Sequence, residues 1–306
     1  MEIIGHQHVL DFLKKSAEID KISHAFLFFG PEKIGKKTVA IEFIKFLNCR
    51  EKDIKKRPCQ SCFFCKEIEK KSHPDFILIE PEKKEIQIGQ IKKLSWGLSL
   101  HAYSAPFKAA IIDEAHLMNE EAQNSLLKTL EEPKGKTVII LVTAFPELLF
   151  PTIVSRTKRI KFSFVAKSEI EKYLKKQGIS EGESKKLFSV SSGKPGEIID
   201  FLSNSIKLKE RNQKINELKE LFNSPLSLRF KYADELVKNP ENINETLSIW
   251  LRYFRNYLHL ILGQPSEAVS YKKIKKIINL IQDINFLISK TEINSKLALE
   301  MILIEL

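Results

Sequence analysis

The sequence has 306 residues, of which 43% are hydrophobic and 29% are charged, so it can bury a core and has the length of about two domains. Apolar runs such as 25–29 and 138–142 are far shorter than the roughly 20 residues that cross a bilayer, which excludes a transmembrane protein. Residues 1–6 lack the pattern of a secretory signal, so we expect a cytoplasmic protein without a membrane partner. The formal net charge of +11 suits a polyanionic partner such as nucleic acid but does not prove one.

The sequence pattern changes near residue 160. Before it, short β-branched or aromatic runs alternate with helical patterns, and the expected strands are 25–29, 76–80, 109–113, 137–143 and 158–162. This alternation predicts an α/β domain with a largely parallel sheet. Beyond it, helix-period patterns take over, at 168–177, 184–190, 197–202 and 242–262. We therefore expect an α/β domain at 1–163, a small helical unit at 164–205 and an all-helical domain at 206–306.

A glycine-rich loop follows the first expected strand and precedes the helical pattern 39–44. It runs from Gly30 through Gly35 to Lys36, which is the strand, loop and helix arrangement of a P-loop. In such a loop the backbone N–H groups and the helix N-terminus surround phosphates, and the lysine reaches the β and γ phosphates. The loop makes ATP a candidate cofactor.

The position after the P-loop lysine departs from this pattern. A Ser or Thr hydroxyl normally holds magnesium there, but this chain has Lys37, and the hydroxyl comes one residue later at Thr38. One residue turns a helical side chain by about 100°, so we expect Thr38 not to replace the missing ligand. Two interpretations stay open: a loop that binds ATP and magnesium, and a loop that only shapes the turn.

Two adjacent carboxylates, Asp113 and Glu114, end the third expected strand. In P-loop enzymes the first such group holds magnesium and the second orients or deprotonates the attacking water. We treat Asp113 and Glu114 as candidate catalytic residues of a motif like Walker B. This motif can be inactive in the present chain. The letters Asp-Glu-Ala-His also suggest a helicase, which we reject because the second half of the chain is helical and shows no second motor domain.

All four cysteines lie between residues 49 and 65, at Cys49, Cys59, Cys62 and Cys65. A reducing cytosol argues against disulfides, and four thiolates at these spacings can surround a tetrahedral Zn²⁺ ion. With four protein ligands the ion has no open position for water, so the predicted site is structural. Other soft metals remain alternatives.

An arginine, Arg156, follows Ser155 near the end of the α/β domain. A Ser-Arg pair alone indicates nothing. An arginine at this place in a nucleotide-binding domain can reach the γ-phosphate bound by a neighbouring subunit and stabilise transition-state charge there.

Taken together, these segments resemble the delta prime subunits of the bacterial DNA polymerase III clamp loader, a family of AAA+ proteins, and the resemblance covers essentially the full length. Besides the cysteine spacing, it is carried by the segments 24–31, 73–75, 112–116, 124–133, 152–156 and 294–300. The resemblance implies an AAA+ domain with a zinc module at 49–65, a helical lid domain at 164–205 and a collar domain at 206–306 that closes the oligomer. It also implies a hetero-pentamer with gamma or tau and delta subunits, which opens the sliding clamp and places it on primer-template DNA.

Within that resemblance, two departures separate this chain from the ATP-hydrolysing gamma and tau subunits. The motor subunits carry Ser or Thr where this chain has Lys37. They also carry an arginine in a turn of the second domain, and the matching turn of this chain, residues 193–197, contains no arginine. Losing two contacts to the magnesium–phosphate unit removes electrostatic stabilisation of the transition state. We therefore expect weak or no intrinsic ATPase, and a non-motor (stator) subunit that donates Arg156 in trans to a neighbouring ATPase site. The alternatives are a gamma/tau-type motor and, in a different class, a zinc-bearing nucleic-acid module.

Overall fold

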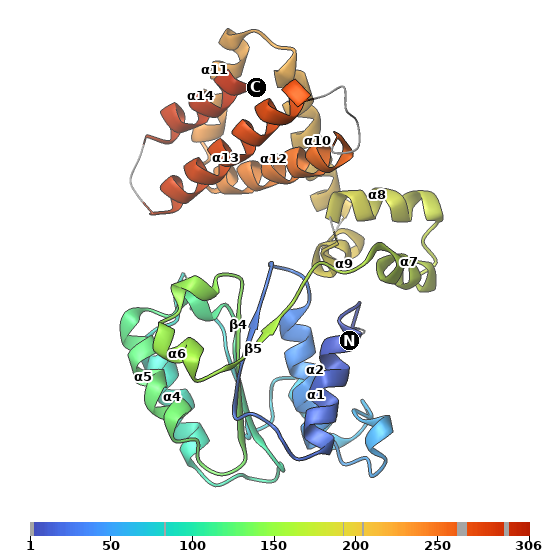
Figure 1. Ribbon diagram of the computed structural model, residues 1–306, viewed down its shortest axis with the longest axis vertical. Coiled ribbons are helices and arrows are strands. Elements are labelled where there is room, and N and C mark those ends of the chain that lie inside the picture. The colour runs from blue at the N-terminus through green and yellow to red at the C-terminus, as the bar shows by residue number, and fades with distance from the viewer. Residues whose placement is uncertain (1–2, 83, 192, 204, 262–267, 291–293) are drawn as a thin grey trace. The chain divides into compact units, whose positions relative to one another are not determined.

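A five-stranded sheet forms the centre of the first of two structural units. The computed structural model describes residues 3–82, 84–191, 193–203, 205–261, 268–290 and 294–306 (Figure 1). The chain divides into the units Met1–Glu197 and Ile198–Leu306. Each unit has a hydrophobic core of its own, so each is described by itself.

The sheet is entirely parallel, with the strand order β2-β3-β4-β1-β5. Its strands are β1 (Ala25–Phe29), β2 (Phe76–Ile79), β3 (Lys108–Ile112), β4 (Thr137–Thr143) and β5 (Lys158–Lys161). All five strands predicted from the sequence are confirmed to within one residue at each end. The continuous apolar runs arise because a parallel sheet is covered on both faces, so both sets of alternating side chains are buried.

Helices cover the two faces of this sheet (Figure 1). Phe26 and Phe28 of β1 pack into one core, whereas Ala25 and Leu27 pack into the other. On the first face lie α1 (Gln7–Glu18), α2 (Lys36–Asn48) and α3 (Phe63–Glu69). On the second lie α4 (Ile88–Ser99), α5 (Glu120–Glu131) and α6 (Pro151–Ser155). This is the α/β layer architecture that the alternation of patterns predicts.

The rest of the described chain is helical. The helices that follow the sheet are α7 (Lys167–Lys176), α8 (Glu181–Ser191) and α9 (Pro195–Ser203). The second unit is built from α10 (Ser205–Phe222), α11 (Leu226–Val237), α12 (Pro240–Ile261), α13 (Ala268–Lys290) and α14 (Ser295–Glu305), around buried residues such as Trp250 and Phe254. The predicted helices all occur, and only residue 262, the expected end of one, lies outside the described residues. None of the described helices is both long and apolar enough to cross a membrane.

Candidate functional site

The predicted P-loop has the backbone shape that its glycines permit. Gly30 leaves the end of β1 with φ 144°, and a Cβ there would collide with the carbonyl group of Phe162. Gly35 has φ 98° and leads directly into α2, whose first residue is Lys36. Positive φ values are costly for residues with a side chain, so glycine is required at both bends. The strand, loop and helix arrangement inferred from the sequence is confirmed.

Lys36 turns back into this loop. Its Nζ donates hydrogen bonds to the carbonyl oxygens of Gly30 at 2.7 Å and Pro31 at 2.6 Å. The residue is only 6% exposed, and this burial lowers the pKa of Lys36 to about 8. In a P-loop with bound nucleotide this ammonium group faces phosphate. In this structure it is hydrogen-bonded to the carbonyl oxygens of the loop.

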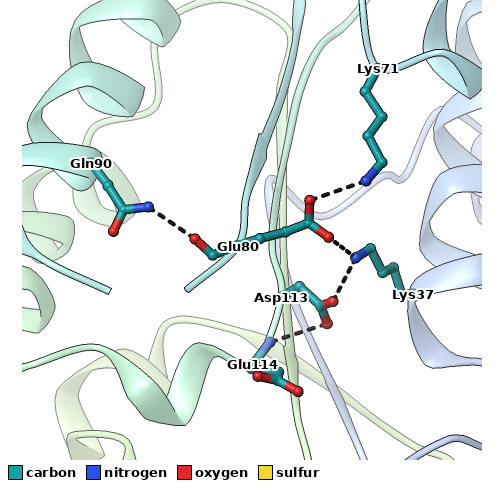
Figure 2. A network of polar contacts seen from close by, with 6 residues as sticks. All are labelled: Lys37, Lys71, Glu80, Gln90, Asp113 and Glu114. Atoms are coloured by element: carbon teal, nitrogen blue, oxygen red, sulfur yellow. Dashed lines mark hydrogen bonds and ion pairs between the residues drawn. The ribbon is translucent and has the colours of Figure 1, made fainter. Parts of the chain in front are cut away.

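Lys37 connects α2 to the carboxyl edge of the sheet (Figure 2). Its Nζ lies 2.8 Å from Asp113 Oδ2 and also donates to Glu80 Oε1. The other oxygen of Glu80 accepts a hydrogen bond from Lys71 Nζ at 3.0 Å. Glu80 and Asp113 are neighbours because Ile79 and Ile112, the last residues of β2 and β3, are paired in the parallel register. Two lysines and two carboxylates thus form one ionic network.

The charges in this network stabilise one another. Although burial lowers the pKa of Lys37, its hydrogen bonds to Asp113 and Glu80 outweigh this effect and raise the pKa. The hydrogen bond from Lys37 lowers the pKa of Glu80. Both partners are therefore charged at neutral pH. The ammonium supplies positive charge to Asp113, the carboxylate that binds magnesium in P-loop enzymes.

The other two predicted residues here have different surroundings. Thr38 lies in the first turn of α2 and is half-buried, but the group in contact with Asp113 is the ammonium of Lys37. Glu114 has φ 48°, and its N–H donates to Asp113 Oδ1 at 3.1 Å. Burial, with Asp113 nearby, raises the pKa of Glu114. The structure therefore brings Lys37 and Asp113 into direct contact and leaves Thr38 outside that contact.

The first turn of α9 packs directly on the P-loop. The N–H of Gly196 donates to the carbonyl oxygen of Lys33 at 2.8 Å. A Cβ at residue 196 would lie 2.8 Å from the same oxygen, which is closer than real Cβ atoms come. Only glycine allows this close approach. A side chain at this position would force the turn away from the loop.

Arg156 lies apart from this network, at the end of α6. Its Nη2 lies 2.8 Å from Glu131 Oε1, and its Nη1 donates to the carbonyl oxygen of Thr152 at 3.1 Å. The side chain is 37% exposed. The guanidinium is therefore both held by the chain and open to solvent.

The four cysteines come together, as the spacing predicts. Their sulfur atoms all lie within 4.8 Å of one another, which is close enough for a single metal ion. Backbone N–H groups of Cys59 and Cys62 donate to Cys49 Sγ and Cys59 Sγ, each at 3.3 Å. Hydrogen bonds, first from the Ser61 hydroxyl, lower the pKa of Cys59 to about 6, whereas burial raises the pKa of Cys49 and of Cys65. N–H···S bonds of this kind favour thiolates, so the donor set fits a soft metal such as zinc.

The sequence of this chain is similar to sequences of DNA polymerase III subunits. A family profile described as DNA polymerase III, delta subunit, matches residues 5–166, just over half of the chain. The chain belongs to this family. The delta prime subunit of Bacillus subtilis DNA polymerase III is 30% identical over 269 residues, which span 88% of this chain and 77% of that relative. The gamma subunit from Buchnera aphidicola of Acyrthosiphon pisum is 28% identical over 303 residues, spanning 92% and 83%.

The delta prime resemblance inferred from the sequence is thereby confirmed: this is a clamp loader protein of the delta prime type. A crystal structure of a gamma-subunit-related protein from Thermotoga maritima has the same overall fold. It superposes with a TM-score of 0.54 at 21% identity and covers 96% of this chain and 97% of that one. At this identity the likeness concerns the fold alone, which is that of the AAA+ proteins of the clamp loader.

Three participants in these sites escaped the sequence analysis. Glu80 binds Lys37, Glu131 binds Arg156, and Lys33 accepts the hydrogen bond of Gly196. Glu80 had a local signal, because it is a carboxylate directly after a strand, at the same edge as Asp113. Glu131 ends α5 beside a second glutamate, and the sequence alone does not distinguish the two.

Proposed function

We propose that this chain is the non-motor (stator) subunit of a bacterial DNA polymerase III clamp loader. It helps to load the sliding clamp onto primer-template DNA in the cytoplasm, and it donates Arg156 in trans to the ATPase site of a neighbouring motor subunit. Its partners are gamma or tau and delta subunits in a hetero-pentamer. Residues 164–205 form the lid domain and residues 206–306 form the collar. Family membership supports the clamp loader assignment.

The contact between Lys37 and Asp113 carries the non-motor assignment. Magnesium in a P-loop enzyme needs a hydroxyl ligand after the lysine and an accessible Walker B carboxylate. Here the hydroxyl position is an ammonium, and that ammonium lies 2.8 Å from the carboxylate. A second cation at this place meets like-charge repulsion, so magnesium has neither its ligand nor its site. Without the ion, hydrolysis by this chain is weak or absent.

The cysteine cluster supports a structural zinc ion as the resident metal. Four thiol ligands complete a tetrahedral site and leave no position for a reacting water. When bound, the ion supplies a cross-link between the end of α2 and α3 rather than chemistry. Cys49, Cys59, Cys62 and Cys65 are its proposed ligands.

A gamma/tau-type motor is the second candidate, because the loop from Gly30 to Lys36 keeps the P-loop backbone and gamma subunits are among the relatives. Equilibrium nucleotide binding to the purified chain, with and without Mg²⁺, separates the two candidates. The stator proposal expects no magnesium-dependent binding. Tight Mg²⁺-dependent binding that is lost in Lys36→Ala would favour the motor.

Arginine donation is tested in the loader assembled with its motor subunits. We expect Arg156→Ala to slow ATP hydrolysis at the facing site by about 10³-fold or more, because a trans arginine stabilises charge on the transferring phosphoryl group. The total rate of ATP hydrolysis by the loader then falls by the fraction that this one site contributes. Arg159→Ala is the matched control: it removes the same charge three residues later, from a guanidinium that stacks on Phe29 at 5.0 Å. An unchanged rate with Arg156→Ala in a fully assembled loader would refute the donation.

A further inference from the structure

We infer that Glu131 is the positioning residue of Arg156. This inference rests on the proposed role of Arg156 in a neighbouring ATPase site. Glu131 itself touches no substrate in this assignment. It acts by holding the guanidinium in the orientation from which it can meet a phosphate group bound by another subunit.

The contacts hold one part of the guanidinium and leave the rest available. Glu131 Oε1 lies 2.8 Å from Nη2, and the carbonyl oxygen of Thr152 accepts from Nη1 at 3.1 Å. An arginine side chain carries five N–H donors, and these two contacts use two of them. The remaining donors are sufficient for a bidentate contact with a phosphate group. The side chain is 37% exposed, so a partner's phosphate can approach it.

The backbones that carry the two residues are anchored in the core. Leu130, directly before Glu131, is 1% exposed, and its carbonyl oxygen is bonded to His24 Nε2 at 3.0 Å. Ile153, three residues before Arg156, is fully buried in the same hydrophobic cluster. Two exposed side chains thus extend from fixed backbone positions. Their mutual contact removes the rotational freedom that an exposed arginine otherwise keeps.

The place of Glu131 in its helix supports a role beyond stabilising the fold. It is the last residue of α5, where the negative end of the helix dipole disfavours a carboxylate. Helix stability therefore does not account for a glutamate at this position. Orienting a cation does, because preorganised charge is what an arginine finger contributes to a transition state.

The first test measures ATP hydrolysis by the assembled loader containing Glu131→Gln. The part of the rate that Arg156→Ala removes is the Arg156-dependent rate. We expect Glu131→Gln to lower kcat in this part by about two- to fivefold, the size of an exposed ion pair, with KM for ATP unchanged. Glu132→Gln is the matched control, because it removes the same charge one residue later. Glu132 makes no ion pair among the residues that the structure describes, so we expect no change from it.

A double-mutant cycle distinguishes positioning from a structural role. If Glu131 acts through Arg156, Glu131→Gln has no further effect on hydrolysis in the Arg156→Ala background. A structural role would lower the rate equally in both backgrounds, through loss of assembled complex. Melting temperatures and complex yields of the Glu131→Gln and Glu132→Gln proteins should agree with those of the wild type.

The outcomes separate this inference from the proposed function. If Arg156→Ala leaves hydrolysis unchanged, arginine donation itself is wrong. If Arg156→Ala slows hydrolysis but Glu131→Gln behaves like Glu132→Gln, only the positioning role is wrong. A faster rate in Glu131→Gln would also overturn it, because Glu131 would then restrain Arg156 rather than present it.

Discussion

Lys37 is the residue that most changes the chemistry of the P-loop. It places a positive charge 2.8 Å from Asp113, which follows β3 where P-loop enzymes have the carboxylate that holds magnesium. Its side chain is 30% exposed and that of Asp113 is 18% exposed, so solvent screens their attraction only in part. The network is balanced, because Lys71 and Glu80 add one charge of each sign.

Replacing Lys37 should create a metal-dependent protein. In Lys37→Thr, Glu80 and Asp113 face each other without the intervening cation, which should lower the free energy of unfolding by about 1 kcal/mol in the absence of metal. Mg²⁺ binds the two carboxylates and restores stability by mass action. Thermal unfolding at increasing Mg²⁺ concentrations measures this. The melting temperature of the variant should rise, and that of the wild type should not.

Lys71→Thr is the control for this experiment. Lys71 is 47% exposed and contacts Glu80 alone among the described carboxylates, so the pair of Lys37 and Asp113 survives its loss. Its melting temperature should not depend on Mg²⁺. A magnesium response in both variants would mean that the ion binds elsewhere, and no response in either would show that Lys37 does not occupy a potential metal site.

At the scale of elements, the first turn of α9 packs directly against the P-loop. Gly196 makes this possible, because its missing side chain lets its N–H reach the carbonyl oxygen of Lys33 at 2.8 Å. The first turn of α9 thus contacts the loop through backbone atoms.

A methyl group at Gly196 should therefore destabilise the protein. We expect Gly196→Ala to lower the free energy of unfolding by about 1 to 3 kcal/mol, the usual size of an overpacking strain. Gly182→Ala is a matched control, since both glycines are the second residue of a helix and a Cβ at Gly182 meets nothing within 4 Å. In that helix alanine is favoured over glycine, so the control should be neutral or slightly stabilised. If Gly196→Ala and the wild type gave the same unfolding curve in denaturant, the close approach of Gly196 to Lys33 would be contradicted.

The cysteine module is also joined to α2 by an ionic contact. Lys45 of α2 is 1% exposed, and its Nζ donates to Gln60 Oε1 at 3.1 Å and lies 3.2 Å from Glu69 Oε2. Gln60 stands between the second and third cysteines, with φ 58°. Any ion that fixes the cysteine loop therefore also fixes the partners of a buried charge. Loss of the metal should weaken the first unit as a whole.

At the scale of the whole molecule, the two units have separate cores. The cysteines lie in Met1–Glu197, whereas the aromatic cluster around Trp250 lies in Ile198–Leu306. Units with separate cores commonly unfold in separate transitions. Metal binding to one unit should therefore be visible in one transition only.

Differential scanning calorimetry of the full chain tests this division. A strong zinc chelator should lower the transition temperature of the first unit and leave that of the second unit unchanged. Added Zn²⁺ should reverse the change. Trp250→Ala should lower the free energy of unfolding of the second unit by about 3 to 5 kcal/mol, because its side chain is fully buried. Only the transition temperature of that unit should then fall. Trp96→Ala is the control, since that side chain is 67% exposed. A single transition that responds to both changes would show that the units unfold together.

Much of the fold and part of the candidate site follow from the sequence by itself. The five strands, the glycine loop, the carboxylates after β3 and the four cysteines are short-range patterns, because side-chain periodicity, bends with positive φ and ligand spacing depend on neighbours in the chain. The departure at Lys37 was also visible there. Its consequence was not, because the sequence shows a missing hydroxyl but does not show what replaces it.

Tertiary structure alone decided which groups meet. Glu80 reaches Lys37 because β2 lies beside β3 in register, and Glu131 reaches Arg156 because α5 and α6 pack on the same face of the sheet. The contact between Gly196 and Lys33 joins residues that are far apart in the sequence. Such pairings depend on strand order and helix packing, which no local pattern encodes. They determine that Lys37 meets Asp113, that Gly196 meets Lys33 and that Arg156 meets Glu131.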